Sequence, residues 1–399
     1  MTSPAAESAR PTPSGLKWFW TSSAGRWLLL ALLWLTPALV ISIQVARNPR
    51  GRTVTDLYHD AAQHWWHHQP LYKGVSGMNY LPHFAGLFTP YDWLGDAAGD
   101  VAWRLTAMAG LAVGLWLFCG TIQRGERTKT GLAVTLMALP MALPAVANGQ
   151  ANAHFGVVLL FAAWCLRTGR WNRAVLLLWL SAAIKPLGFA AIGLAWAVYP
   201  LLWWRLAIGL PLFAAFPFLL GPFDYAQSQY LAVWQNLREC AAVTENRFAD
   251  INGLFRAAGM PLTGNVSLVV RALAGGLFMA ACWLGVRRES EPKRAILWLG
   301  AAAAFLMLCN PMNEANSYVI FSPPLALLAV WEWWNGDRRL GWLFGLMGLS
   351  MGILPEPLQH VFGNSFSLCW HPAMTLIFAG ALVWRFLANR EERPEGTVI

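Results

Sequence analysis

The stretch WLLLALLWLTPALVISIQV, residues 27–45, decides the fold class of this chain. It carries no charged residue and is long enough to cross the hydrocarbon core of a bilayer as one helix. Apolar runs of similar character recur through all 399 residues, of which 57% are hydrophobic and 12% are charged. A soluble domain usually has about twice that charged fraction. The sequence therefore predicts an all-α integral membrane protein that crosses the bilayer many times.

About twelve membrane-spanning helices are predicted, within a single transmembrane domain over residues 26–390. A break at Lys185-Pro186 separates two of them, because proline interrupts a helix and the charge pattern calls for a turn there. Hydropathy alone leaves open whether residues 174–203 cross once or twice. The predicted spans are 27–45, 102–120, 131–147, 153–166, 174–184, 187–203, 206–221, 266–286, 295–309, 317–334, 340–354 and 369–388.

Arginine and lysine residues gather between alternate pairs of these spans. By the positive-inside rule these turns face the cytoplasm, so both termini, with short tails at 1–25 and 391–399, are expected on the inner side of the cytoplasmic membrane. Orientation and contact with anionic lipids explain the formal net charge of +9 better than nucleic-acid binding does. The extracytoplasmic face then receives short loop helices within the loops 46–101, 222–265, 310–316 and 355–368.

Cysteine and histidine do not form a convincing metal site in this sequence. The six cysteines show no CxxC pair, and most fall within or beside apolar spans, where cysteine behaves as a small core residue. His64 and His68 are spaced i,i+4 and could together bind a metal. An interfacial helix with solvated histidines is the favoured interpretation. No metal or other cofactor is therefore expected.

The loop after the first span contains the sequence TVTDLYHD at residues 53–60. Asp56 and Asp60 are spaced i,i+4, so on a helix they share a face, and close carboxylates tend to raise one pKa towards the range of a general base. Asp56 is also consistent with the N-cap of a helix that begins near Leu57. The two roles are compatible, and the spacing does not decide which aspartate is the base.

Further polar residues fall at the extracytoplasmic ends of predicted spans. Asn148, Gln150 and Asn152 can bind sugar hydroxyls, or they can cap two helix ends. Lys185 lies in an apolar run, where an ammonium group is costly unless it meets an anion or reaches the interface. A lipid-linked phosphate is the expected partner of this lysine.

Glu314 lies between amide side chains at a predicted helix start. It is consistent with a sugar ligand, a second acid, or a cap for the next span. The loop 222–265 adds charged and amide residues and is large enough to form a lid. Its sequence does not assign individual roles to them.

Five motifs in register, spanning residues of about 54 to 330, resemble a known family. They are Tyr58 to Ala61 with Pro70-Leu-Tyr72 and Tyr80-Leu-Pro82; Asn148-Gly-Gln150-Ala-Asn152; Ala183-Ile-Lys185-Pro186; Asp250-Ile-Asn252-Gly253-Leu254; and Asn310-Pro311 to Tyr318. The chain resembles the glycosyltransferase family 87 members of the GT-C superfamily, the polyprenyl-phosphate-mannose-dependent α-mannosyltransferases typified by the mycobacterial phosphatidylinositol mannoside enzymes.

The chain departs from the family's pattern at two places. The family's loop acid precedes the alanine that matches Ala61 by a spacing that falls on Val54 here, so Asp56 is shifted by two residues. The family also tends to place a histidine in the segment that matches residues 310–318. This chain offers Asn313, Glu314 and Asn316 there, which points to a different sugar or acceptor.

The resemblance implies a GT-C-like helical bundle that moves one sugar, most often mannose, from a polyprenyl phosphate to a lipid or glycan acceptor outside the cytoplasm. Asp56, with Asp60 in reserve, would be the general base of a displacement that inverts the anomeric carbon. Lys185 and Arg247 would bind the donor phosphate. The expected sugar and acceptor ligands are Tyr58, His59, Asn148, Gln150, Asn152, Asn252, Asn313 and Glu314.

Two other functional classes fit parts of the sequence. A flippase or transporter of lipid-linked saccharides would carry charged residues at mid-membrane on several helices and would form no bond. A glycan polymerase or ligase would also use an outer loop but would transfer whole oligosaccharides. The sequence does not specify the acceptor, the linkage, the exact sugar or the oligomeric state.

Overall fold

The computed structural model describes residues 22–49, 51, 53–74, 77–123, 125–241, 248–363 and 365–391. Within these residues the chain is nearly all helical and has no strand. The helices are α2 (Ser23–Arg47), α3 (Thr55–Trp66), α4 (His83–Asp92), α5 (Asp96–Ile122), α6 (Arg127–Ala147), α7 (Ala151–Arg167), α8 (Trp171–Ile184), α9 (Gly188–Val198), η1 (Pro200–Leu202), α10 (Trp203–Leu220), α11 (Phe223–Ala241), α12 (Ile251–Ala257), α13 (Gly264–Val286), α14 (Lys293–Cys309), η2 (Ala315–Ile320), α15 (Ser322–Asn335), α16 (Arg338–Ile353), α17 (Pro355–Phe362) and α18 (Ser365–Glu391).

Six helices in the described part of the chain are long and apolar enough to cross a membrane: α2, α5, α6, η1 with α10, α13, and residues 368–388 of α18. The prediction of an all-α membrane protein is therefore confirmed for the described residues, with six candidate spans. The other six predicted spans coincide with helices of 17 residues or fewer, namely α7, α8, α9, α14, α15 and α16. The count of about twelve spans therefore stays a prediction. Most of both predicted tails lies outside the described residues.

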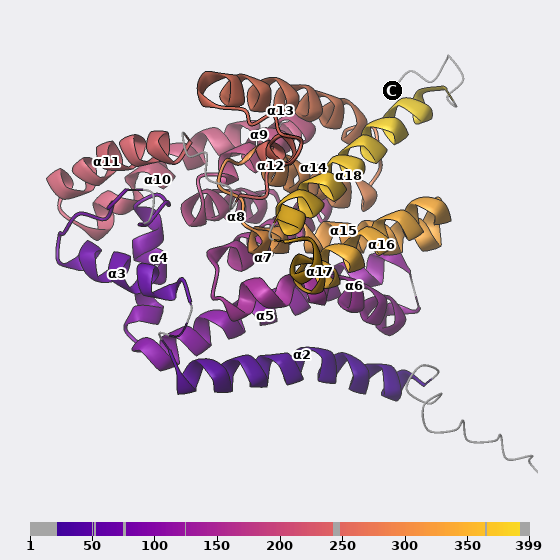
Figure 1. The fold of residues 1–399 in the computed structure, drawn as a ribbon, viewed down its shortest axis with the longest axis horizontal. Coiled ribbons are helices and arrows are strands. Elements are labelled where there is room, and N and C mark those ends of the chain that lie inside the picture. The colour runs from indigo at the N-terminus through magenta and orange to yellow at the C-terminus, as the bar shows by residue number, and fades with distance from the viewer. Residues whose placement is uncertain are drawn as a thin grey trace, which may run out of the picture.

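Successive helices run back and forth between two ends of the bundle. The basic end holds the turns that join α5 to α6, α7 to α8, α9 to α10, α13 to α14 and α15 to α16, as two contacts illustrate. Arg205 Nε donates to Asn172 Oδ1 at 3.0 Å, and Lys293 Nζ lies 3.6 Å from Glu332 Oε1. The opposite end, which we call the site end, holds α3, α4, α11 and the remaining turns. The start of α2 and the end of α18 lie on the same side of the molecule (Figure 1).

The segment around Lys185-Pro186 forms a tight turn between two short helices. Helix α8 ends at Ile184, and α9 starts at Gly188 and returns to the basic end, where Trp283 Nε1 donates to Ala197 O at 2.8 Å. A Cβ at Gly188 would lie 2.3 Å from the backbone nitrogen of Ala182, so only glycine fits this turn without displacing backbone. The structure therefore resolves residues 174–203 as two helices, with Lys185 at the site end.

Helix α3 lies at the site end and packs on α4. Its buried residues include Tyr58, Ala61, Ala62 and Trp65, at the i, i+3, i+4 and i+7 spacing of an apolar helix face. Helix α11 packs against the loop that follows α3, because Gln229 Oε1 accepts from the backbone N–H of Leu71 at 3.0 Å. Helices α3 and α11 and this loop thereby form part of the wall of a cavity.

Candidate functional site

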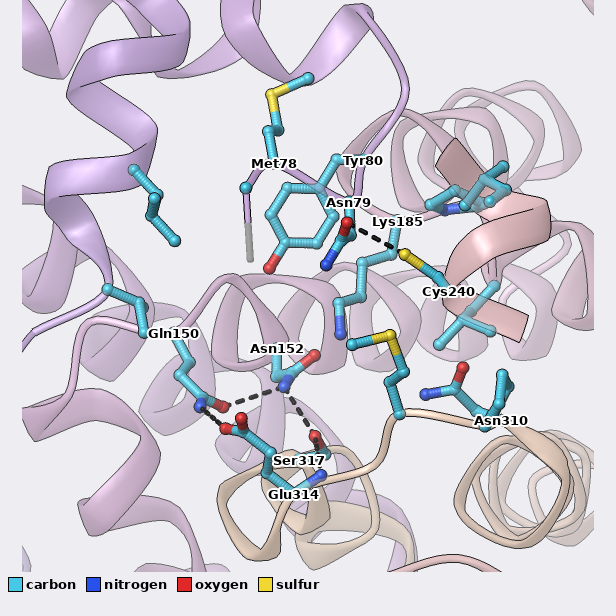
Figure 2. A pocket seen from close by; sticks show the side chains of 18 of the residues that line it. Met78, Asn79, Tyr80, Gln150, Asn152, Lys185, Cys240, Asn310, Glu314 and Ser317 are labelled. Carbon is cyan, nitrogen blue, oxygen red and sulfur yellow. Dashed lines mark hydrogen bonds between the residues drawn. The ribbon is translucent and has the colours of Figure 1, made fainter. Parts of the chain in front are cut away.

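A cavity of about 470 Å³ opens at the site end, where segments far apart in the sequence meet. Its wall comes from the start of α3, residues 77–80, the α6–α7 turn, the α8–α9 turn, α11 and residues 310–317 (Figure 2). The polar lining residues are Tyr58, Asn79, Tyr80, Gln150, Asn152, Lys185, Cys240, Asn310, Glu314 and Ser317. Amides are the largest group in this set, and the described lining residues include one lysine and one glutamate.

Lys185 extends its ammonium group into this cavity (Figure 2). Its Nζ lies 5.6 Å from the centre of the Tyr80 ring, and no carboxylate of the described residues forms an ion pair with it. Burial lowers the pKa of Lys185 to about 8, although the charge of Glu314 raises it. At neutral pH the lysine is therefore mostly a cation, which an anionic ligand can neutralise.

A chain of hydrogen bonds fixes the polar floor of the cavity. Gln150 Nε2 donates to Glu314 Oε2 at 3.0 Å, and Asn152 Nδ2 donates to Gln150 Oε1 at 2.9 Å and to Ser317 Oγ at 3.0 Å (Figure 2). Glu314 and Ser317 also form a capping box at the start of η2. These contacts hold the side chains in one arrangement before any ligand binds.

Asn152 keeps one unpaired polar atom in this floor. The residue is only 4% exposed, and both hydrogen bonds of its amide use the Nδ2 donor, whereas Oδ1 has no partner among the described residues. The great majority of buried polar atoms in proteins have a hydrogen-bond partner. An unpaired acceptor beside the cavity is consistent with a ligand that brings a hydroxyl donor.

The α6–α7 turn is held in place by helix α3 and helix α5. The Ala151 N–H donates to Tyr58 Oη at 3.1 Å, and Trp103 Nε1 donates to Gly149 O at 2.8 Å. Gly149 has φ of +70°, and a Cβ there would lie 2.7 Å from Thr55 Cγ2. This turn therefore requires glycine, and it places Gln150 and Asn152 beside α3.

Tyr58 and Tyr80 form a pair whose hydroxyl oxygens lie 3.1 Å apart. Burial raises the pKa of Tyr58, and burial together with the neighbouring Tyr58 raises the pKa of Tyr80 well above 10. Both phenols are therefore neutral at physiological pH and act in the cavity as hydrogen-bonding groups.

The two loop aspartates lie elsewhere. Asp56 and Asp60 share one face of α3, as their spacing predicts, but that face is exposed and neither residue lines the cavity. The alternative that Asp56 caps a helix is wrong, because α3 begins at Thr55 after the N-cap Val54 and no side chain caps it. Val54, onto which the resemblance would carry the acid, does line the cavity.

Four other predicted ligands fall outside the cavity lining. His59 is buried between Asp92 and Asp100, and Asn252 donates to Ser267 Oγ at 2.8 Å. Asn313 is buried and donates to the carbonyls that end α14. The backbone carbonyl of Asn148 accepts a hydrogen bond from the Val54 N–H at 3.3 Å. Arg247, the second predicted phosphate ligand, lies outside the described residues.

The cavity thus unites five of the predicted residues: Tyr58, Gln150, Asn152, Lys185 and Glu314. It also contains Asn79, Tyr80, Asn310 and Ser317, for which the sequence predicts no role. Tyr80, Asn310 and Ser317 lie within or beside the motifs that carry the family resemblance, and this position is a signal that could have found them. Asn79 has no such signal beyond its place next to Tyr80.

A second, largely apolar groove of about 500 Å³ lies between α4, α8 and α10. Leu180, Leu212 and Phe213 are among its lining residues. Ala183 and His83 also line it, and they are two residues from Lys185 and three from Tyr80 in the sequence. The groove therefore starts near the cavity, and Asn172 and Arg205 line it at the basic end.

Comparison with known proteins gives a match to one family model. This model, described as Glycosyltransferase family 87, matches residues 79–311, which is more than half of the chain. The matched stretch contains the α6–α7 turn, Lys185 and most of the cavity lining. No curated protein matches the sequence.

Proposed function

Because the chain belongs to glycosyltransferase family 87 and is a membrane glycosyltransferase, we propose that it transfers one sugar from a polyprenyl phosphate to a lipid or glycan acceptor. The sugar in this proposal is mannose. The reaction takes place at the site end, which faces away from the cytoplasm, in the cytoplasmic membrane. The observation that carries the proposal is the ammonium group of Lys185 in a cavity lined by amides.

A phosphate group is the proposed partner of Lys185. A lysine without an ion-paired carboxylate is costly beside a membrane, and an anionic ligand lowers that cost. The Nζ lies near the Tyr80 ring and on the same cavity as Glu314. In the transition state the bond to the phosphate oxygen breaks, and the lysine stabilises the charge that develops there.

The apolar groove supports a lipid-linked donor. Its wall consists mainly of leucine, phenylalanine, tryptophan and valine side chains of α4, α8 and α10. An isoprenoid chain has no polar groups and gains free energy when such a wall removes it from water. In our proposal the donor lies with its phosphate at Lys185 and its tail along this groove.

The cavity itself fits a single sugar. A volume of about 470 Å³ is typical of sites that enclose one small ligand, whereas a long glycan would extend far beyond it. Gln150, Asn152, Asn79 and Asn310 offer both donors and acceptors for hydroxyl groups. These amides orient the sugar so that its anomeric carbon faces the acceptor.

The proposed chemistry is one displacement with inversion. The acceptor oxygen attacks the anomeric carbon, and polyprenyl phosphate leaves on the opposite face of the sugar. A general base must take the acceptor proton. The sequence predicts Asp56, or Asp60, for this step, and that assignment stays a prediction because both carboxylates lie outside the cavity lining.

The first test is a transfer assay with purified protein. Radiolabelled polyprenyl-phosphate-mannose is incubated with total membrane lipid and glycan extracts and with wild type, Lys185→Ala or Lys73→Ala. We expect wild type to label an acceptor and Lys185→Ala to lose about 10²–10³-fold in rate. Lys73 is exposed at the same end and does not line the cavity, so its variant should match wild type.

The other functional classes give different results in parallel arms. Transfer only from pyrophosphate-linked oligosaccharides would replace the proposal with a polymerase or ligase. Movement of a lipid-linked saccharide across a vesicle membrane without bond formation would replace it with a transporter. Equal activity of Lys185→Ala and wild type would reject the phosphate-binding role of Lys185.

A further inference from the structure

Glu314 alone supplies a carboxylate among the described residues that line the cavity. The residue is exposed, whereas the neighbouring Asn313 and Ser317 are buried. Lys185 lies on the same cavity (Figure 2), close enough for the charge of Glu314 to act on it. A reacting sugar bound between them would therefore have the cation on one side and the carboxylate on the other.

The orientation of Glu314 is fixed, but part of its hydrogen-bonding capacity is unused. Gln150 Nε2 donates to Oε2 at 3.0 Å, and the backbone N–H of Ser317 donates to the same side chain through the capping box. A carboxylate offers about four acceptor positions. Two donors therefore leave room for the hydroxyl group of the acceptor substrate. The hydrogen-bond chain through Asn152 and Ser317 keeps the carboxylate from rotating.

Other groups on the cavity are poor proton acceptors. Tyr58 and Tyr80 stay neutral because burial raises the pKa of both phenols. Burial lowers the pKa of Lys185 to about 8, so the group is mostly protonated at pH 7, and a bound phosphate would favour the proton further. Amide side chains do not accept a proton in this pH range.

We propose that the carboxylate of Glu314 is the general base of the transfer, and this inference rests on the proposed function. The acceptor oxygen forms a bond to the anomeric carbon while its proton moves to Glu314. The bond between that carbon and the phosphate oxygen breaks, and its electron pair leaves with the polyprenyl phosphate at Lys185. The exposed face of Glu314 then returns the proton to water.

The central variant is Glu314→Gln, which keeps the size of the side chain and a carbonyl oxygen for Gln150. We expect it to lose about 10²–10⁴-fold in transfer rate to the natural acceptor, the usual contribution of a general base. Glu314→Asp should recover part of this loss. The matched control is Glu356→Gln, which removes an exposed carboxylate that does not line the cavity and should keep the wild-type rate.

Azide distinguishes a base from a residue that only positions the sugar. Azide ion needs no deprotonation, so in the presence of polyprenyl-phosphate-mannose it can form mannosyl azide without a base. We expect Glu314→Gln to produce this compound at nearly the wild-type rate although it no longer uses the hydroxyl acceptor. The acidic limb of kcat/KM against pH should also disappear in this variant.

Several results would overturn the inference. If Glu314→Gln loses mannosyl azide formation as strongly as acceptor transfer, Glu314 is a sugar-binding residue. If it transfers at the wild-type rate, or if Asp56→Asn is the variant that loses the hydroxyl reaction alone, the base is elsewhere. Failure of wild type to use any polyprenyl-phosphate sugar rejects the proposed function itself. This result differs from a loss of activity in the Glu314 variant alone.

Discussion

At the scale of single residues, His59 shows how a predicted ligand can have a structural task. Its Nδ1 lies 2.8 Å from Asp92 Oδ1 and its Nε2 lies 3.2 Å from Asp100 Oδ1. Asp100 also accepts from Thr55 Oγ1 at 2.7 Å and lies 3.5 Å from Arg104. This buried cluster joins α3 to α4 and α5, so it positions the helix that carries Tyr58.

The same cluster predicts how stability depends on pH. Burial lowers the pKa of His59, but the hydrogen bonds and charges of Asp100 and Asp92 outweigh it, so the folded-state pKa is raised above 6.5. The protonated imidazole therefore contributes stability that is fully present below pH 6.5 and is lost as pH rises through the raised pKa. The substitution His59→Ala removes this imidazole and should destabilise the protein by about 3 kcal/mol at pH 6. The effect should be smaller at alkaline pH.

Thermal unfolding in detergent at a series of pH values measures this effect. His64→Ala is the matched control, since His64 lies on the same helix and its imidazole forms no ion pair with a carboxylate of the described residues. If the unfolding temperature depends on pH equally in wild type and His59→Ala, the stabilising positive charge does not belong to His59.

At the scale of elements, the site depends on two tight turns that contain glycine. Gly149 lets the α6–α7 turn approach α3, and Gly188 lets α9 start against the end of α8. Each turn contributes residues to the cavity lining: Gln150 and Asn152 come from the first turn, and Lys185 comes from the second. The segment around Lys185 thus forms part of the cavity wall because α8 and α9 run in opposite directions.

Substitution of Gly188 tests the α8–α9 turn. A Cβ there would meet the backbone of Ala182 and Ser181, which cannot move without displacing α8. Gly188→Ala should therefore destabilise the protein by about 1–3 kcal/mol and raise KM for the donor, because Lys185 shifts. Donor titration in the transfer assay and thermal unfolding measure both effects.

Gly193 provides the control within the same helix. It lies in α9, and a Cβ added there would have no neighbouring atom within 4 Å, so Gly193→Ala should be neutral or should stabilise the helix by up to about 1 kcal/mol. Similar losses in both variants would mean that α9 tolerates no added methyl group, and the special requirement for glycine at the turn would be refuted.

At the scale of the whole molecule, the arrangement of two ends predicts a membrane topology. The cavity and the exposed residues Lys73 and Glu356 belong to the site end, whereas Lys129, Arg170 and Arg339 belong to the basic turns. Because basic residues are in excess on one side, the positive-inside rule predicts that this side faces the cytoplasm. The start of α2 and the end of α18 lie on the same side of the molecule (Figure 1), so we expect both to face the cytoplasm.

Cysteine labelling tests this orientation in intact cells. In a background with Cys309→Ser and Cys369→Ser, the two partly exposed thiols, a membrane-impermeant maleimide should react with K73C and E356C. K129C, R170C and R339C should react only after the membrane is permeabilised. The reverse pattern would place the cavity in the cytoplasm and would contradict a donor presented on the outer face.

The sequence by itself determined the membrane class, the approximate positions of the apolar helices and the two ends at which polar residues gather. These follow from local rules: apolar length fixes a helix, proline and glycine fix its ends, and basic residues separate the two faces. Lys185, Gln150 and Glu314 could be named because each is a polar residue at the end of an apolar run.

Tertiary structure decided which of the named residues meet. Asp56 and Asp60 are each two residues from Tyr58, so on α3 they point roughly 160° away from it. Periodicity defines these two faces but does not say which one turns inward. Packing of Tyr58 against Phe84 and of Trp65 against Tyr225 buries one face, and the aspartates are left outside because burying apolar rings releases free energy whereas burying unpaired carboxylates costs it.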